Sequence, residues 1–201
     1  MISSPSGGGK STIARHLLEA REDVTYSVSA TTRPIRPGES DGTSYHFLER
    51  AEFERRLAAG EFVESAEYGG HLYGTLRAEV NQGLAAGKHV VLDIEVAGAR
   101  QVRAQFPNSV HVFVLPPSAP MLVQRLRGRQ TEDGAAVARR LAIASEELLA
   151  AREYQYVVVN DDVVDAVAHV AAILDCESRR VSRLVNLDLV IENLRRDLAG
   201  Q

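Results

Sequence analysis

The residues with the clearest chemical potential lie in one glycine-rich stretch near the start of the chain, Ser4–Thr12. A phosphate chain needs several hydrogen-bond donors around it, and the backbone N–H groups of a turn containing three consecutive glycines supply them without side chains in the way. Lys10 would place its ammonium group against the β- and γ-phosphates, while the Ser11 hydroxyl would hold Mg²⁺. The following helix would point its positive N-terminus at the anion. The stretch therefore predicts a site for an ATP-type ligand.

This stretch departs from the usual pattern G-x-x-x-x-G-K-[ST] in two respects. Ser4 stands where the first glycine is expected, which the turn tolerates if the backbone there keeps an ordinary φ angle. A phosphate loop also follows a buried β-strand, but only Met1, Ile2 and Ser3 precede it, fewer than the roughly five residues of a usual strand. We therefore expect a truncated first strand that anchors the loop poorly.

Hydrophobic periodicity places this loop in a chain where strands and helices alternate. The run His89–Glu95 is apolar and ends in acids, as expected of a parallel strand buried on both faces whose C-terminal end opens onto a ligand. Further strands are expected at residues 24–32, 44–48, 110–115 and 156–160, and helices at 11–21, 52–59, 75–87, 121–126 and 134–152. This pattern predicts an α/β fold, a doubly wound parallel sheet.

Two segments interrupt the alternation. Residues 32–73 begin with a loop of prolines and glycine that projects Arg33 and Arg36, and continue as short strands and a hairpin. Residues 125–133 form a charged, arginine-rich segment. We expect the first to be a small, mainly β insertion and the second to belong to a lid.

Composition limits the classes of function. A chain of 201 residues forms one domain with a substantial core, and its net charge of −4 argues against nucleic-acid binding. No stretch is long and apolar enough to cross a membrane and no leader suggests export, so a cytoplasmic protein is expected. One cysteine excludes disulfides within the chain, and the six histidines show no metal-ligand spacing.

Several segments together resemble the guanylate kinases. They are Ser3–Thr12, Ser27–Glu39, Tyr45–Phe47, Glu61–Glu64, Tyr73–Thr75, Leu92–Glu95 and Val159–Asp161. The resemblance covers about residues 2 to 174, in the right order. It implies a P-loop kinase fold with a small, mainly β GMP-binding insertion and a helical lid. It also implies phosphoryl transfer from ATP to GMP and dGMP, giving ADP and GDP, with Mg²⁺, in purine nucleotide metabolism.

The resemblance divides the chain into four parts. The P-loop core domain comprises 1–31, 74–124 and 141–176, the GMP-binding insertion 32–73, the lid 125–140, and a C-terminal helical extension 177–201.

On the acceptor side, the resemblance implies GMP contacts from Ser29, Arg33, Arg36, Glu39, Tyr45, Glu64, Tyr73, Thr75, Asp93 and Glu95. The chemistry agrees, because Arg33 and Arg36 can each donate two hydrogen bonds to a phosphate dianion. Glu64 can accept from the N1–H and amine of guanine, while hydroxyls donate to O6. Adenine would leave such groups unpaired at about 1 to 3 kcal/mol each. Glu95 departs from the family, which often has aspartate there, so its contact is open.

On the donor side, the resemblance implies ATP contacts from Ser6, Gly7, Gly8, Gly9, Lys10, Ser11, Thr12 and Asn160, and a metal held by Ser11 and Asp93. It implies catalytic roles for Lys10, Arg33, Arg125, Arg129 and Arg140. No dedicated base is needed, because the attacking phosphate has a second pKa of roughly 6 and is already mostly anionic at neutral pH. The arginines would stabilise charge and close the site against water.

Two other functions are weighed. A catalytically weak or inactive guanylate-kinase-like interaction module would keep the fold without ATP binding, but Lys10 and Ser11 speak against it. A kinase for another monophosphate would require a different base pocket from Glu64, Ser29 and Thr75.

Beyond residue 174 the resemblance fades. Apolar residues recur at steps of three or four: Val181, Leu184, Leu187, Ile191, Leu194 and Leu198. This spacing predicts an amphipathic helix. It is open whether its apolar stripe packs back on the domain or forms a homo-oligomer with another chain.

Overall fold

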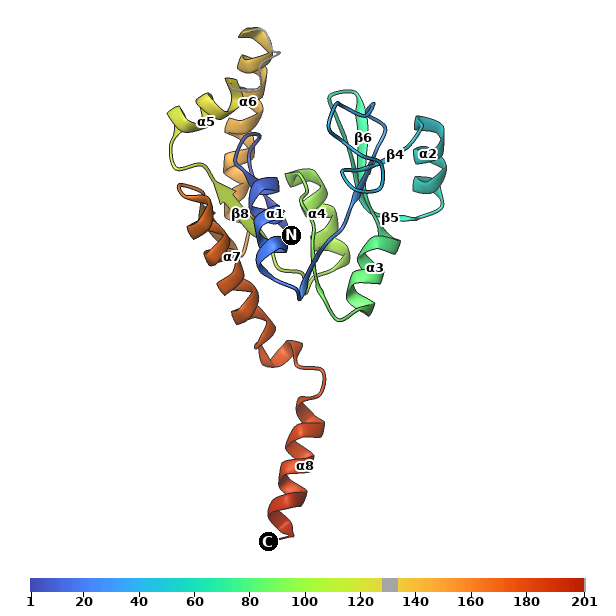
Figure 1. The fold of residues 1–201 in the computed structure, drawn as a ribbon, viewed down its shortest axis with the longest axis vertical. Coiled ribbons are helices and arrows are strands. Elements are labelled where there is room, and N and C mark those ends of the chain that lie inside the picture. Colours follow the sequence, from blue (N-terminus) through green and yellow to red (C-terminus); the bar gives the residue numbers. More distant parts are fainter. Residues whose placement is uncertain (128–133, 201) are drawn as a thin grey trace.

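A parallel sheet forms the centre of the molecule in the computed structural model, which describes residues 1–127 and 134–200 (Figure 1). Its strands are β2 (Val24–Tyr26), β7 (His89–Val91), β1 (Ile2–Ser3), β8 (Val112–Leu115) and β9 (Tyr156–Val159). β2 pairs with β7, β1 with β8, and β8 with β9, all in parallel. Backbone hydrogen bonds from β1 to the chain just after β7 join these pairs into one sheet.

The first strand lies between two neighbours. Ile2 donates its N–H to the carbonyl of Leu92 at 2.9 Å and accepts from the N–H of Ile94 at 3.3 Å, while its other edge is in register with Val112. The strand has two residues, short as its sequence indicated, but Ile2 and Ser3 are buried. The phosphate loop is therefore held at the centre of the sheet, contrary to the poor anchoring expected.

Helices cover both faces of this sheet. Val112 and Val114 of β8 pack on one face, in a core cluster with residues of α1 (Lys10–Ala20) and α7 (Val163–Ser178). Phe113 points to the opposite face, because side chains alternate along a strand. There it packs with Val96, the first residue of α4 (Val96–Gln105), and with Ala150 of the 3₁₀ helix η1 (Ala150–Glu153). The predicted doubly wound arrangement is confirmed.

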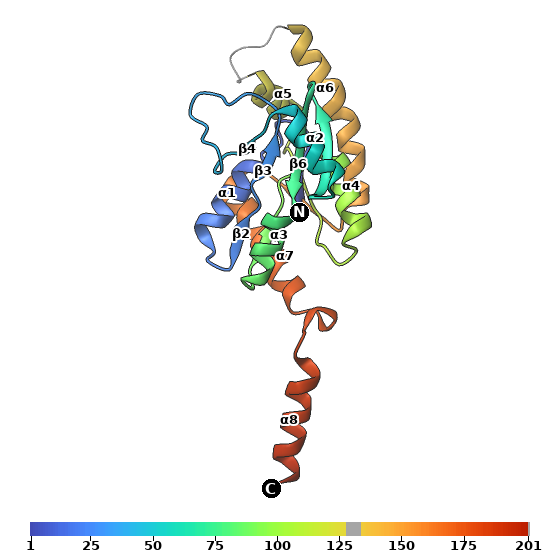
Figure 2. The same cartoon turned by 90° about the vertical axis from the view of Figure 1, so that its right-hand side faces the viewer.

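A second sheet carries the inserted segment. Its strands run in the order β4 (His46–Phe47), β3 (Ser29–Thr31), β6 (His71–Leu76) and β5 (Phe62–Tyr68), and α2 (Arg50–Ala58) packs against it. β5 and β6 form the predicted hairpin. Figures 1 and 2 show this sheet beside the core, with α3 (Arg77–Ala85) leading back to the central sheet.

The strand expected over residues 24–32 is wrong as a single element. Ser27 makes the last backbone bond to the core sheet, to the carbonyl of Val91 at 3.1 Å, and the chain then joins the second sheet as β3. The alternation of apolar residues continues across the break although all three residues of β3 are buried, so the sequence pattern does not mark the change of sheet.

The remaining helices also refine the expected boundaries. The first three residues of the arginine-rich segment, 125–127, belong to α5 (Ala119–Arg127), and residues 128–133 lie outside the described part of the chain. The helix expected to reach residue 152 is divided into α6 (Gly134–Leu149) and η1. The strand expected over 89–95 has three residues in β7, after which the chain continues alongside β1.

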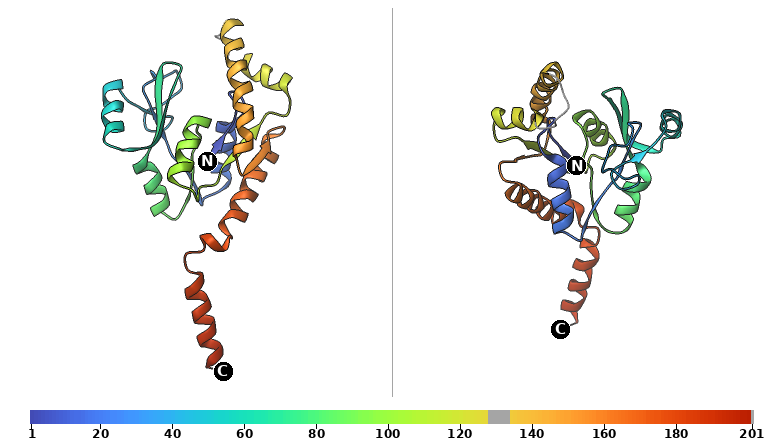
Figure 3. Two further views of the ribbon diagram at one scale, coloured as in Figure 1. Left: turned by 180° about the vertical axis from the view of Figure 1, so that it is seen from behind. Right: turned by 45° about the horizontal axis from the view of Figure 1, so that its top comes forward.

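The amphipathic helix expected at the C-terminus is present as α8 (Leu187–Ala199), but it begins later than expected, because the chain forms a 3₁₀ turn, η2 (Val181–Arg183), after α7. Glu177, whose side chain is nearly buried, accepts hydrogen bonds from Tyr156, Arg180 and Arg183 and so fixes the turn. α8 then extends away from the body, at the end opposite α5 and α6 (Figures 1 and 3).

No helix among the described residues has the length and apolar character needed to span a bilayer. Nor do residues 1–127 and 134–200 bring together three or more histidine, cysteine or acidic side chains suited to a metal ion.

Candidate active site

The phosphate loop has the backbone that its glycines allow. Gly7 and Gly9 have φ angles of 82° and 96°, in the left-handed region that strains other residues. Gly8 is required for space instead, since an added Cβ would lie 2.6 Å from the Cβ of Ser4. Among the described residues only glycines have positive φ, so Ser4 keeps an ordinary backbone at the first-glycine position, as expected.

Lys10 begins α1 and faces two carboxylates in the segment that follows β7. Its Nζ lies 2.8 Å from Oε1 of Glu95 and 3.5 Å from Oδ1 of Asp93. Burial disfavours the charged amine, but the two carboxylates outweigh it and raise the pKa of Lys10 well above its usual value. Ser11 donates its hydroxyl to the other oxygen of Asp93. A lysine, a hydroxyl and two acids thus meet where phosphates would arrive.

A cleft of about 570 Å³ opens beside the loop. It is lined by Ser4, Gly7, Gly9, Lys10, Ser11, Thr12, Arg125, Asn160, Asp161, Asp162 and Val163. The Asn160 amide donates to the carbonyl of Gly8 at 3.0 Å, and Arg125 Nη2 donates to the Asn160 carbonyl at 3.1 Å. Arg125 Nη1 is buried without a hydrogen-bond partner among the described residues. The cleft therefore contains a cationic donor with unused capacity.

Asn160 follows β9 and packs so closely on the loop that a Cβ at Gly9 would lie 2.1 Å from its amide nitrogen. The helix that follows, α7, is capped by Asp162, whose carboxylate accepts from the N–H groups of Val164 and Asp165.

Helix α6 contacts the phosphate loop at Ser6 through two side chains. Arg140 Nη2 donates to the Ser6 hydroxyl at 3.1 Å, and Oε2 of Glu147 accepts from the Ser6 N–H at 3.0 Å. Burial raises the pKa of Glu147. Sequence reasoning missed Glu147; the available signal was its spacing of seven from Arg140, which puts both on one face of a helix. Arg129 lies outside the described residues.

On the second sheet, Arg33 is buried against a local partner. Its guanidinium donates to both carboxylate oxygens of Glu39, at 2.7 and 3.0 Å, and lies 5.4 Å from the centre of the Tyr45 ring. Its hydrogen bonds to Glu39 raise the pKa of Arg33, and the same bonds lower the pKa of Glu39. The Arg36 N–H donates to the same carboxylate, while its side chain is exposed.

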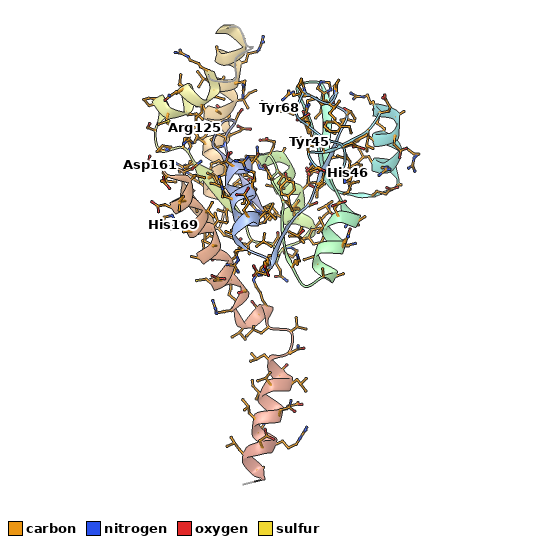
Figure 4. All side chains as sticks on the ribbon, viewed as in Figure 1. Tyr45, His46, Tyr68, Arg125, Asp161 and His169 are labelled. Carbon is orange, nitrogen blue, oxygen red and sulfur yellow. The ribbon has the colours of Figure 1, made fainter. Side chains whose placement is uncertain are left out.

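The charged groups Lys10 and Arg33 both influence the hydroxyl of Tyr45. Its ring meets Tyr73 edge to face, with centroids 6.1 Å apart. Burial raises the pKa of Tyr45 and the negative charge of Asp93 adds to this, whereas the ammonium of Lys10 and the guanidinium of Arg33 oppose it. Charged groups of both sites therefore contribute to the pKa shift of this one hydroxyl. Figure 4 shows Tyr45 on the insertion and Arg125 and Asp161 across from it.

The predicted base pocket is a buried polar cluster. Glu64 on β5 accepts from the Thr75 hydroxyl at 2.7 Å, and Ser29 is in register with Thr75 across β3 and β6. All three are buried. Burial raises the pKa of Glu64, and the bond from Thr75 partly offsets this. Gly98 of α4 packs on the carboxylate so tightly that a Cβ there would lie 2.3 Å from Oε2.

Glu95 lies between the two sides. It precedes α4 and binds Lys10, and its charge also contributes to raising the pKa of Glu64. Glu95, which departs from the family pattern, therefore binds the lysine of the phosphate loop.

The comparisons with known proteins agree with this geometry. A family model described as guanylate kinase matches residues 1–177. The chain is 51% identical over 183 residues to a guanylate kinase of Symbiobacterium thermophilum, covering 91% of this chain and 87% of the relative. It is 49% identical over 174 residues to that of Frankia casuarinae, covering 87% of this chain and 95% of the relative.

A solved structure gives the same result. The crystal structure of guanylate kinase from Anaplasma phagocytophilum superimposes with a TM-score of 0.79 at 33% identity, covering 96% of this chain and 92% of that chain.

Proposed function

The chain belongs to the guanylate kinase family, and from that premise we propose that it transfers the γ-phosphoryl group of ATP to GMP, giving ADP and GDP. The observation that carries this proposal is the placement of two charged groups: Lys10, paired with Glu95 and Asp93 in the core, and Arg33, which packs in the insertion on the ring of Tyr45. A donor phosphate at Lys10 and an acceptor phosphate at Arg33 would meet across Tyr45. Bringing two anions together in line is the main task of such a kinase.

On the donor side, the backbone of the phosphate loop cradles the ATP phosphates and Lys10 leaves Asp93 and Glu95 for the β- and γ-phosphates. Asn160 holds the loop by its bond to Gly8 and stands on the wall of the ATP cleft. The exchange of a carboxylate for a phosphate keeps the ammonium paired, so the buried charge never lacks a partner.

On the acceptor side, Arg33, Arg36, Tyr45 and Tyr73 bind the GMP phosphate, and Glu39 holds Arg33 in place until that phosphate arrives. Glu64 accepts from guanine N1–H and the exocyclic amine, and the hydroxyls of Ser29 and Thr75 donate to O6. Adenine presents an unprotonated N1 to the same carboxylate, which disfavours it. GMP and dGMP are the expected substrates, since the pocket reads the base.

Mg²⁺ fits the residues beside Lys10. Hard divalent cations take oxygen ligands, and the Ser11 hydroxyl lies against Asp93, whose Oδ1 is buried without a hydrogen bond among the described residues. When bound with ATP, the ion would neutralise charge on the phosphates. Ser11 would bind it directly and Asp93 would orient its water ligands.

The lid is the third contributor. Arg125 and Arg140 approach the phosphates from α5 and α6, and their positive charge stabilises the transferring group while the closed lid keeps water out. We assign the same role to Arg129. The division into core (1–31, 74–124, 141–176), insertion (32–73), lid (125–140) and extension (177–201) belongs to this proposal.

The alternative of an inactive interaction module is not favoured. The relatives that are about 50% identical to this chain are guanylate kinases, and the chain has Lys10, Ser11 and a formed phosphate loop.

The test is ADP release from ATP and Mg²⁺ with GMP, dGMP, AMP or UMP as acceptor. We expect turnover with GMP and dGMP and little with AMP or UMP. An absence of turnover with GMP in a folded sample would rule out the proposed kinase activity. Equal turnover with AMP would rule out the proposed guanine pocket.

A further inference from the structure

Helix α8 leaves its apolar side chains in solvent. None of its residues is buried, and Ile191, Leu194 and Leu198 are 43%, 59% and 74% exposed. In every view the helix stands away from the rest of the chain (Figures 1, 2 and 3). A contiguous apolar stripe on a soluble chain marks an interaction surface.

The stripe has the spacing of a two-stranded coiled-coil seam. Within α8, steps of four and three alternate without interruption, which places these residues at heptad positions a and d: Leu187, Ile191, Leu194 and Leu198. Leu189 is equally apolar and 57% exposed, but it falls at position f, on the opposite side of the helix. The helix therefore carries a matched pair of leucines, one in the seam and one outside it.

We propose that α8 binds the α8 of a second copy of this chain in antiparallel orientation. Leu187 then packs opposite Leu198 of the second copy, and Ile191 opposite Leu194. The same two layers recur by symmetry, so every seam residue within α8 is covered. The interface is self-complementary, as a two-fold dimer requires.

The charges beside the seam favour the antiparallel arrangement. In an antiparallel pair, e positions face e positions, and this register brings Asp188 near Arg195 of the second copy, twice. In a parallel pair, the position that would face Asp188 is 183, which lies in η2 and outside α8. Arg183 is already bound to Glu177, with Nη2 at 2.9 Å, so it is not available for that contact.

The shape of the molecule favours the same orientation. α8 has 13 residues, about 20 Å in length, and packed helix axes lie only about 8–10 Å apart. Because only three residues separate η2 from α8, a parallel pair would force both bodies into the same space. An antiparallel pair puts the bodies at opposite ends and leaves the lid end of each molecule free.

The test measures the mass of the full-length chain by sedimentation over a concentration series. We expect a reversible dimer. Leu194→Asp should raise the dissociation constant at least tenfold, whereas the matched control Leu189→Asp should change it by less than about twofold. Neither variant should alter the kcat/KM for GMP or the melting temperature of the body, because α8 has no buried residue.

Charge reversal tests the orientation. Asp188→Arg and Arg195→Asp should each weaken self-association, and mixing the two variants should restore a dimer, because each then meets opposite charges at both e positions. A chain that is monomeric at every concentration overturns the proposal. The apolar stripe would then pack on its own chain or bind another protein. A dimer insensitive to Leu194→Asp puts the interface elsewhere and overturns it as well. A dimer weakened by Asp188→Arg but not by Arg195→Asp would indicate parallel pairing and overturn the register.

Discussion

The two cationic sites are held ready in different ways. Lys10 is paired with Glu95, 85 positions away in the sequence, and with Asp93, so its position depends on the central sheet. Arg33 is paired with Glu39, six positions away within one loop. The donor site is thus a product of the whole core, and the acceptor site is built locally. A substitution at one site should therefore change the binding of one nucleotide and leave the binding of the other unchanged.

The largest expected effect comes from the donor side. Lys10→Ala should lower kcat by at least about 10²–10³-fold, because it removes a preorganised charge from the transferring phosphate. GMP binding, measured by calorimetry, should stay within about twofold of the original chain. Lys88→Ala is the matched control, since Lys88 is exposed and is the only other lysine. Joint loss of GMP binding would mean that the two sites are not separable.

Substitution in the base pocket should have the next largest effect. Glu64→Gln keeps the shape but turns an amide toward the donor edge of guanine, so kcat/KM for GMP should fall by about tenfold to 100-fold, the equivalent of roughly 1 to 3 kcal/mol. KM for ATP should not change. Glu67→Gln, on the same strand but exposed, is the control. An unchanged ratio of GMP to AMP turnover would contradict the pocket.

A milder change tests the local character of the acceptor site. Arg33→Lys keeps the charge but loses the planar fork that binds two oxygens, so KM for GMP should rise about tenfold. KM for ATP should remain the same, and exposed Arg50→Lys should change neither. An equal rise in both KM values would show that the loop and the core act as one unit.

The last prediction concerns the acid stability of the core, which involves neither nucleotide. His111 lies just before β8, 2% exposed, and burial lowers its pKa to about 4. Because the unfolded chain takes up this proton first, near pH 6.5, the free energy of unfolding should fall between pH 6.5 and 4 by about 1.4 kcal/mol per unit. Urea titrations at several pH values measure it. His111→Gln should flatten the slope, and His16→Gln, at a histidine whose side chain is 40% exposed, should not. Equal slopes in both variants would rule out His111.

The sequence was sufficient where contacts are local or where one residue type has few alternatives. The positive φ at Gly7 and Gly9 follows from their place in the loop, and the hairpin around Gly69 and Gly70 follows from turn chemistry. The resemblance anticipated residues such as Glu64, whose surroundings in the structure are polar and buried.

Contacts between elements that are distant in the sequence could not be predicted from the sequence. Glu147 binds Ser6 over 141 positions, and its spacing from Arg140 indicates a shared helix face but not which loop that face contacts. The break at Ser27 and the turn held by Glu177 were also missed, because period and propensity do not report which sheet a strand joins or where a buried acid redirects the chain.

Gly98 has a consequence for how substrate choice could change over evolutionary time. The residue has no side chain and lies on a helix behind the carboxylate that reads guanine. A single added methyl group would push that carboxylate out of position. Relaxed substrate preference could therefore arise from a helix position without any change to the residues that bind the base.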